Sequence, residues 1–431
     1  MTRVVVVGAG PAGLAAAEHA LRAGADVTVL DQADAPGGQY HRTLPGARHG
    51  FEALLSRCTW WPESTVWALD GKRVHVLRGP ADGTGRRRHV LEPDALVLAT
   101  GAHDRVLPFP GWQLPGVFTA GAAQALAKGE RVAVGRRVLV AGAGPFLLPV
   151  AESLLDVGAG VLAVLEANPV STVLKGWSWR AAAHVGKTGE LVRYAGTLAR
   201  HRVPYRMGRT VVEARGDDRV REVVTARVRA DWSVVPGTER TYEADAVCVG
   251  HGFVPQPELA VAAGCALDGG FVRVADDQRT SVPGVFSAGE ITGIGGAVTA
   301  AAEGAVAGCV AAGGRPGRAL LRARDRARAF AGRLAAAHPI GAAWPGWLHE
   351  DTIVCRCEET TYGDLKSAAT DPAAPGPHAL KLGTRAGLGP CQGRMCGPAV
   401  ADLCGGAERH HRPIAQPIRL GELADPKETD A

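Results

Sequence analysis

The 431-residue sequence predicts an α/β protein with two parallel-sheet nucleotide-binding domains and a small C-terminal domain of helices and loops. A valine-rich strand that runs into a glycine motif occurs at residues 3–31 and again at 136–167, which predicts the two sheets. The small domain is predicted by two close pairs of cysteines near the C-terminus: Cys355, Cys357, Cys391 and Cys396.

Composition is that of a globular protein with ample core, because 46% of residues are hydrophobic and 21% are charged. No uninterrupted apolar stretch is long enough for a bilayer, and the N-terminal apolar run has no cleavage site, so we expect neither a membrane span nor a secretory signal. Nine cysteines do not resemble a secreted disulfide framework, which predicts a cytoplasmic protein. A net charge of +5 is modest, and we expect no nucleic-acid partner.

Each glycine of the first motif has a structural role. The motif lies in RVVVVGAGPAGLAAAEHALRAGADVTVLD. Gly8 permits a tight turn, Gly10 lets a pyrophosphate approach the backbone, and Gly13 lets the helix pack closely on the strand. The helix starts near Pro11 and Ala12, and its free N–H groups and partial positive charge favour phosphate binding.

Asp31 ends the second strand, 18 residues after Gly13, where a carboxylate can bind ribose hydroxyls. A ribose 2′-phosphate would be repelled there, and Gln32 supplies no compensating arginine. Strand, motif, helix, strand and acid in this order predict a dinucleotide with a free 2′-hydroxyl.

Three further stretches indicate which dinucleotide binds. PGGQY contains Gly38 and Gln39, LVLATGAHDR closes a strand at Thr100–Gly101, and VFSAGEITGIGGAVTAAAEG has a turn at Gly289–Glu290 before a helix of small residues. The combination resembles the two-dinucleotide-domain flavoproteins that include the pyridine-nucleotide disulfide reductases. The alternative is that these glycines only form ordinary loop turns and bind no cofactor.

That resemblance implies a Rossmann-like flavoprotein fold with FAD in the first domain and the second domain inserted in the first. It also implies that the turn at Gly289–Glu290 touches the ribityl chain, although the family's usual acid is aspartate and Glu290 is one methylene longer. The expected FAD-binding residues are Gly8, Gly10, Pro11, Ala12, Gly13, Asp31, Gln32, Gly38, Gln39, Thr100, Gly101, Gly289, Glu290, Gly296 and Ala297.

The second glycine motif is degenerate. Gly142 and Gly144 are present, but Leu147 stands where helix and strand should nearly touch, which is expected to push the helix outward and weaken the phosphate cradle. Glu166 still ends the second strand, so NADH or another adenine nucleotide remains an alternative. We interpret this domain as kept mainly for structure.

The cysteine pattern is Cys-x-Cys, then 33 residues, then Cys-x4-Cys. Four thiolates suit zinc or an iron–sulfur cluster, and the one-residue gap argues against zinc. Glycines around the second pair can wrap a cluster and point N–H groups at its sulfurs. A cluster is favoured, with zinc and a disulfide pair as the alternatives.

VCRCEETT…GLGPCQGRMCG resembles the bacterioferritin-associated-ferredoxin-like [2Fe-2S] domain. It is most similar to the variant found in flavoprotein subunits of the opine oxidase, hydrogen cyanide synthase and dye-linked proline or hydroxyproline dehydrogenase group, and GAGPFLL, VGHGFVPQPEL and AGEITGIGGA extend this resemblance over nearly the whole chain. It implies a [2Fe-2S] cluster on Cys355, Cys357, Cys391 and Cys396.

The same resemblance implies a heteromeric assembly. A partner flavoprotein of the glycine-oxidase or sarcosine-oxidase type would oxidise the C–N bond of an amino acid or opine, and this chain would carry the electrons onward. In some members FMN lies between subunits, and a small ferredoxin-like subunit is a further candidate partner. No acid–base pair or nucleophilic triad is evident here, so no catalytic residue is assigned. The alternatives are an NADH-dependent reductase that uses FAD and the cluster, and a non-catalytic scaffold.

The predicted domains are a first nucleotide domain at 1–112 and 251–312, an inserted second one at 113–250, a linker at 313–350 and a cluster domain at 351–431. The linker contains the arginine-rich run RPGRALLRARDRARAFAGR, in which apolar residues recur at helical spacing. We expect a helix with one packed face and outward-facing arginines.

Overall fold

The chain divides into two compact units in the computed structural model. Unit 1 contains Met1–His103, Pro255–Gly332 and His410–Ala431, and unit 2 contains Asp104–Val254 and Arg333–Arg409. The structure describes residues 1–44, 46, 50–177, 185–372, 376–405, 414–424 and 428–430. This division is coarser than the predicted domains, and it groups 410–431 with unit 1; the finer boundaries remain a prediction.

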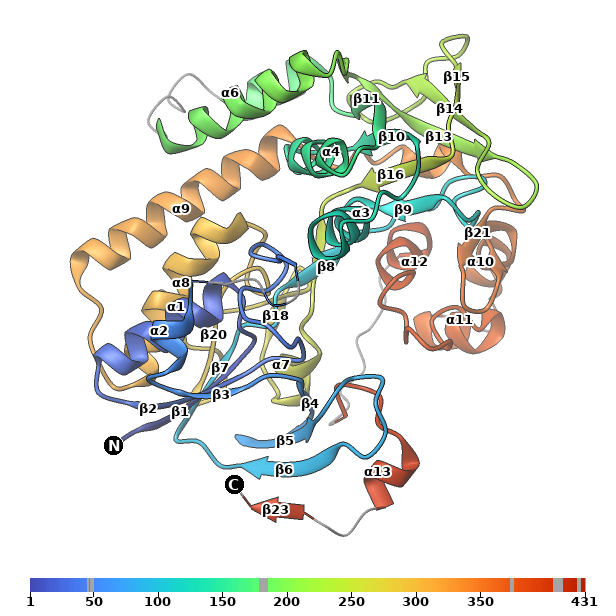
Figure 1. Ribbon diagram of the computed structural model, residues 1–431. Coiled ribbons are helices and arrows are strands. Elements are labelled where there is room, and N and C mark those ends of the chain that lie inside the picture. Colours follow the sequence, from blue (N-terminus) through green and yellow to red (C-terminus); the bar gives the residue numbers. More distant parts are fainter. Residues whose placement is uncertain are drawn as a thin grey trace. The chain divides into compact units, whose positions relative to one another are not determined.

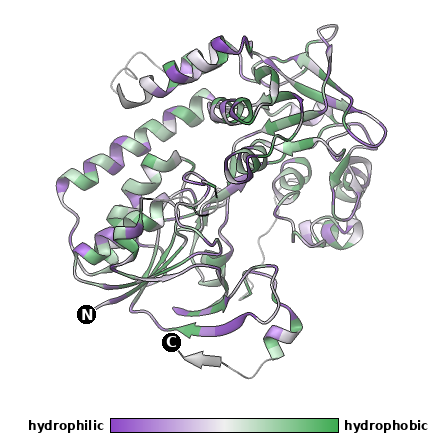
Figure 2. Cartoon of the chain, in the orientation of Figure 1, coloured by the Kyte–Doolittle hydropathy of each residue, from purple (hydrophilic) through white to green (hydrophobic). Residues whose placement is uncertain are grey.

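Unit 1 is built on a five-stranded parallel sheet whose strand order is β20-β7-β1-β2-β3. Its strands are β1 (Arg3–Val7), β2 (Asp26–Leu30), β3 (Thr59–Trp61), β7 (Ala95–Leu98) and β20 (Val285–Ser287). Val4 and Val6 of the central strand β1 are almost completely buried, as expected of a parallel sheet covered on both faces. Figure 2 shows this hydrophobic strand in green.

Two helices of unit 1 pack against each other at unusually short range, α1 (Pro11–Arg22) and α8 (Gly296–Ala311) (Figure 1). A Cβ atom at Gly304 would lie 1.9 Å from the carbonyl oxygen of Ala12, and one at Gly308 would lie 1.9 Å from that of Ala16. Only glycine allows the two backbones this close, so the first two turns of α1 lie directly against the second half of α8.

A second sheet of unit 1 has the order β23-β6-β5-β4 and includes C-terminal residues. Its strands are β4 (Ser64–Asp70), β5 (Arg73–Arg78), β6 (Arg87–Leu91) and β23 (Glu428–Asp430). The helix α13 (Leu420–Ala424) is held by the buried ion pair of Arg86 and Glu422, with Nε and Oε1 2.7 Å apart. The remaining elements are α2 (Glu52–Leu55), α7 (Glu258–Ala262), β18 (Leu267–Asp268) and β19 (Phe271–Val272).

Unit 2 repeats the parallel design, with the strand order β12-β11-β10-β16-β9. The strands are β9 (Val117–Thr119), β10 (Arg137–Gly142), β11 (Gly160–Glu166), β12 (Tyr205–Met207) and β16 (Ala246–Gly250). Its helices are α3 (Ala120–Ala125), which runs into a π-helical turn at Leu126–Glu130, α4 (Leu147–Asp156), α5 (Val170–Gly176) and α6 (Val185–Arg200). An antiparallel sheet is formed by β13 (Arg209–Arg215), β14 (Glu222–Arg227) and β15 (Arg240–Glu243).

The cysteine-bearing region of unit 2 consists of short elements. These are a 3-10 turn at Trp344–Trp347, β21 (Ile353–Cys355), β22 (Thr360–Thr361), α10 (Tyr362–Ala369), α11 (Pro377–Thr384) and α12 (Gly397–Cys404). The start of α10 is capped reciprocally by Thr361 and Asp364. Cys355 and Cys396 belong to the same hydrophobic core as Ala143 and Ala167 of the second nucleotide fold.

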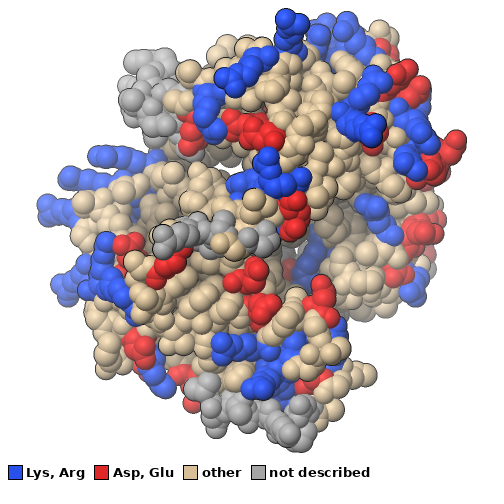
Figure 3. Space-filling model, in the orientation of Figure 1, with Lys and Arg blue, Asp and Glu red and all other residues tan. Residues whose placement is uncertain are grey.

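The helix α9 (Arg318–Ala337) lies inside the predicted linker, and the chain passes from unit 1 to unit 2 within it. The expectation of outward arginines is right for Arg318, Arg322 and Arg326, which are exposed, and basic side chains project from this part of the surface in Figure 3. It is wrong for Arg324, whose side chain is 5% exposed and pairs with Asp325.

The chain also passes between the units near β8 (Ala102–Asp104) and β17 (Phe253–Pro255). Within the described residues, no helix combines the length and the apolar character that crossing a membrane requires.

Candidate functional site

The first glycine turn is crowded on two sides and open on the third. At Gly8, where φ is +103°, a Cβ would lie 2.3 Å from the Ala99 carbonyl oxygen, and at Gly13 a Cβ would lie 1.7 Å from that of Gly8. At Gly10, at the start of α1, a Cβ would meet no atom within 4 Å. The turn therefore leaves free space beside backbone N–H groups at a helix start, which fits a dinucleotide pyrophosphate.

The loop that contains Gly38 and Gln39 folds onto this turn. The Gly37 N–H donates to the Ala9 carbonyl oxygen at 2.8 Å, and a Cβ at Gly38 would lie 3.0 Å from the Cα of Gly10. Gln39 is exposed and accepts a hydrogen bond from the Arg42 Nε at 3.0 Å, while Gln32 is exposed.

Asp31 holds the glycine turn in place. Its Oδ2 accepts the Ala9 N–H at 2.5 Å and its Oδ1 accepts the Ala33 N–H at 2.8 Å. Burial raises the pKa of Asp31, although these N–H donors and Arg42 oppose the change. Part of this carboxylate's hydrogen-bonding capacity is thus already used by the chain itself.

Residues 100, 101 and 289 approach from the neighbouring strands β7 and β20. The Thr100 hydroxyl donates to the Gln256 carbonyl oxygen at 2.7 Å, and Gly101, with φ at +73°, has open space at its Cβ position. A Cβ at Gly289 would lie 2.8 Å from the Cβ of Ala12. The turn after β20 therefore touches the first turn of α1.

Glu290 reaches the N-terminus of α8. Its Oε1 accepts the Gly296 N–H at 3.3 Å, and burial raises the pKa of this carboxyl. Pro11 and Ala297 line one cavity of about 640 Å³ along α1 and α8, together with Tyr40 and Phe51. A volume of this size is typical of small-molecule sites. The predicted residues from four separate stretches thus meet at one edge of the unit 1 sheet.

The second glycine turn differs from the first at the helix start. The helix α1 begins at Pro11, directly after Gly10, whereas α4 begins at Leu147, two residues later than the matching position. The Leu147 N–H donates to the Gly144 carbonyl oxygen at 3.3 Å, and the Leu148 N–H donates to that of Pro145 at 3.1 Å. These N–H groups are engaged within the turn. Leu147 itself is fully buried against Gly250.

Glu166, the acid at which an adenine nucleotide was left as an alternative, is fully buried, and both its oxygens accept hydrogen bonds from the chain. Its Oε2 accepts the Gly144 N–H at 2.8 Å and lies 3.2 Å from the His338 Nδ1. Its Oε1 accepts the backbone N–H of Asn168 at 2.9 Å and the side-chain N–H of the same residue at 3.0 Å. The Cβ of His338 lies 4.0 Å from the Cβ position of Gly144. Asp31 of the first fold accepts two comparable backbone N–H groups. The difference therefore lies in His338 and the Asn168 side chain, whose added contacts with Glu166 disfavour an adenine nucleotide here.

The four thiols approach one another as two pairs. The Cys357 thiol donates a hydrogen bond to the sulfur of Cys391, and Cys396 is hydrogen-bonded to Cys355. Among the described residues, no three His, Cys, Asp or Glu side chains are grouped to hold one metal ion. Two pairs fit a [2Fe-2S] cluster, in which each of the two irons takes two protein ligands.

Backbone groups around the second pair favour thiolate. Burial acts to raise the pKa of Cys391, but the N–H groups of Met395, Gly393 and Arg394 and the Cys357 thiol outweigh it and hold this pKa below its usual value. A Cβ at Gly389 would lie only 2.2 Å from the Cβ of Cys357. The predicted glycine-rich wrapping therefore has a specific contact in the structure.

Polar contacts that the sequence did not indicate hold the cysteine region on the second nucleotide fold. The Trp112 indole donates to the Ile353 carbonyl oxygen at 2.5 Å, and Arg105 pairs with Asp402. Trp347 donates to the Trp232 carbonyl oxygen at 3.0 Å, and their rings stack 5.8 Å apart. These partners are more than a hundred residues apart in sequence, so no local pattern could have found them.

Comparisons with known proteins agree with both sites. Residues 2–304 match the family model of pyridine nucleotide-disulphide oxidoreductases, and residues 353–404 match that of the BFD-like [2Fe-2S] binding domain. One of the subunits of the opine oxidase of Rhizobium meliloti is 32% identical over 98% of this chain and 87% of that protein. Hydrogen cyanide synthase subunit HcnB of Pseudomonas aeruginosa is 32% identical over 91% of this chain and 90% of that protein.

The crystal structure of L-proline dehydrogenase from P. horikoshii has the same fold, with a TM-score of 0.67 and 18% identity over 98% of this chain and 79% of that chain. The predicted α/β flavoprotein fold with its small C-terminal domain is thus confirmed, as are FAD and a [2Fe-2S] cluster as the cofactors of the two families. FMN, a second nucleotide and the individual ligand residues stay predictions. The chain belongs to the pyridine nucleotide-disulphide oxidoreductase family, in the group of flavin and iron–sulfur oxidoreductase subunits that includes those of opine oxidase and hydrogen cyanide synthase.

Proposed function

We propose that this chain is the electron-transferring subunit of a heteromeric amino-acid or opine dehydrogenase. In this proposal a partner flavoprotein of the glycine-oxidase or sarcosine-oxidase type oxidises the C–N bond, and this chain takes the electrons through FAD and the cluster. Two relatives support a heteromeric assembly because each is named as one subunit of an oxidase or a synthase.

One observation carries the proposal: in the second nucleotide fold, the chain's own residues surround the acid that stands where a pyridine nucleotide's ribose would bind. Glu166 is buried, both its oxygens are engaged, and His338 lies on it beside Gly144. A family member that used NADH would need this position free for the ribose. The observation favours another protein as the electron source over the NADH-dependent reductase.

The cysteines also support an electron-transferring role over that of a disulfide reductase. All nine are free, and the sequence contains no C-x-x-C or C-x4-C before Cys391, so a redox-active disulfide beside the flavin has no candidate residues. When bound, FAD takes up an electron pair and releases single electrons, and a [2Fe-2S] cluster passes on one at a time. The chain's own contribution is to hold the pyrophosphate at the Gly10 turn and the irons on four thiolates.

The test is anaerobic reduction of the chain, alone and with its partner. FAD, iron and acid-labile sulfide are first measured in protein purified with whatever co-elutes, and FMN is assayed separately. NADH should leave the flavin absorption of the isolated chain unchanged. A panel of proline, hydroxyproline, sarcosine and opines should bleach the flavin only in the reconstituted complex, and a cluster signal should follow in electron paramagnetic resonance.

Three results would contradict the proposal. Prompt bleaching of the isolated chain by NADH would identify a self-contained reductase. Rapid amine oxidation by the isolated chain would place the C–N chemistry here instead of in a partner. Colourless, folded protein that contains zinc would support the scaffold alternative.

A further inference from the structure

A buried carboxylate lies directly beneath the turn that the resemblance assigns to the flavin. The Oε2 atom of Glu303 in α8 accepts the Gly289 N–H at 2.9 Å and the Thr292 hydroxyl at 2.8 Å. The Thr292 hydroxyl also lies 2.8 Å from the Gly289 carbonyl oxygen. Both polar groups of the Gly289 residue are therefore fixed by one small network, and Glu290 follows at the next position.

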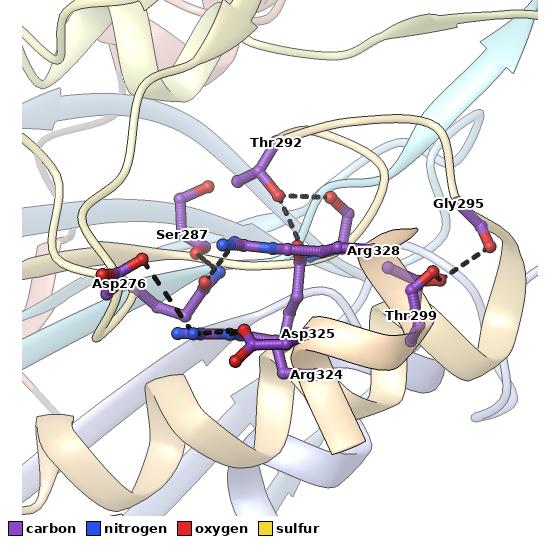
Figure 4. Close-up of polar contacts among 12 residues, drawn as sticks. Asp276, Ser287, Thr292, Gly295, Thr299, Arg324, Asp325 and Arg328 are labelled. Carbon is purple, nitrogen blue, oxygen red and sulfur yellow. Dashed lines mark hydrogen bonds and ion pairs between the residues drawn. The ribbon is translucent and has the colours of Figure 1, made fainter. Parts of the chain in front are cut away.

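The other oxygen of Glu303 is held by α9. The Arg328 Nε lies 2.6 Å from Oε1 of Glu303, and an Nη atom of Arg328 donates to the Gln278 side-chain oxygen at 2.5 Å. Gln278 is fully buried and donates to the Ser287 carbonyl oxygen at 2.8 Å. Figure 4 shows Arg328 directed toward Thr292 and Ser287. The Arg328 guanidinium is thus linked to the turn after β20 at two points, to Gly289 through Glu303 and to Ser287 through Gln278.

Glu303 is a buried charged residue in an otherwise uncharged helix. The helix α8 contains no other charged residue, and the Glu303 side chain is only 5% exposed. Burying a carboxylate carries a desolvation penalty that pairing with an arginine often fails to recover, so helix packing alone does not favour it over a neutral residue. What the charge supplies here is a strong acceptor for the backbone of one turn.

We infer that Glu303, held by Arg328, is a positioning residue for FAD. It fixes the peptide of Gly289 so that the Gly289–Glu290 turn meets the cofactor beside the first turn of α1, where a Cβ at Gly289 would lie 2.8 Å from Ala12. The inference rests on the FAD site of the family and is independent of the proposed direction of electron flow.

The test compares FAD binding to Glu303→Gln, Glu303→Ala and Arg328→Met, with Arg324→Met as the control. Arg324 also lies on α9 and is buried, but its ion-pair partners are Asp325 and Asp276 and, among the described residues, none of its hydrogen bonds reaches the turn (Figure 4). Glu303→Gln keeps one acceptor and loses the ion pair, so its FAD dissociation constant should rise about tenfold. Glu303→Ala should raise it on the order of a hundredfold.

A second readout separates positioning from simple stability. The flavin absorption bands and the midpoint potential of the bound flavin should shift in Glu303→Gln and Arg328→Met, and both should stay at wild-type values in Arg324→Met. Thermal unfolding of the apoproteins shows whether the fold is kept. Wild-type FAD affinity, spectrum and potential in both Glu303 variants, with lowered unfolding temperature alone, would overturn the inference. Loss of FAD equally in Arg324→Met would also overturn it.

Discussion

Substituting Gly389 by alanine should abolish assembly of the iron–sulfur cluster. A Cβ at this position would lie 2.2 Å from the Cβ of Cys357 and 3.3 Å from its sulfur. Ordinary contact begins at 3.4 Å, so the backbone at one of the two residues must move by 3.4 − 2.2 = 1.2 Å. Metal–ligand distances tolerate about 0.2 Å, so if Cys357 is the residue that moves, its displacement is about six times what a ligand tolerates.

The assay is iron and acid-labile sulfide per chain, together with the visible spectrum. Gly389→Ala should contain almost no iron or sulfide while keeping its FAD, because the first nucleotide domain belongs to unit 1 and the cysteines to unit 2. The matched control is Gly383→Ala in α11, where a Cβ meets no atom within 4 Å and alanine favours the helix by about 1 kcal/mol. A Gly389→Ala protein with full iron, full sulfide and an unchanged spectrum would refute the reasoning that the Gly389–Cys357 contact positions a cluster ligand.

Three further predictions concern stability. Burial, reinforced by Arg105, lowers the pKa of His251 to about 3. Between pH 6.5 and 3 this imidazole is therefore protonated only in the unfolded chain. The free energy of unfolding should fall on acidification by about 1.4 kcal/mol per pH unit in this range. Urea unfolding of His251→Leu should lose this dependence, and identical pH profiles would contradict it. Gly304→Ala should force α1 and α8 apart, because its Cβ would lie 1.9 Å from the Ala12 carbonyl oxygen. The thermal unfolding midpoint should fall and FAD should be released. Retained flavin would argue against the close packing of the two helices. Glu422→Gln should cost about 3 kcal/mol by leaving Arg86 buried without its charge partner, and should speed proteolysis of the C-terminal residues; wild-type resistance would count against the pair.

The geometry of the first glycine turn was predictable because its determinants are local. Gly8, Gly10 and Gly13 follow a valine strand at fixed spacing. Gly8 contacts the adjacent strand, Gly13 contacts its own turn, and Gly10 leaves open space beside the helix start. The four thiols were predictable as a group for a similar reason, because both close pairs lie on short loops. Their pairing across the two loops, Cys357 with Cys391 and Cys355 with Cys396, had no sequence signal.

Glu166 and Glu303 show where such prediction stops. The first ends an apolar strand, where ribose binding was left as an alternative, and the second interrupts an apolar helix and had no predicted role. Their partners are distant in sequence: Arg328 lies in α9, and His338, directly after α9, is 172 residues beyond Glu166.

The amino-acid sequence by itself determined that this protein has two glycine-turn folds, an acid at the end of each second strand and four clustered thiols. Only the tertiary structure decided that the first turn is open, that His338 lies on Glu166 beside the second, and that Glu303 accepts the Gly289 N–H. The physical reason is that periodicity and spacing specify which residues share an element and where it ends. Which distant side chain then fills the space at that end depends on how helices pack, and here Gly304 and Gly308 set the approach of α1 and α8 to backbone contact.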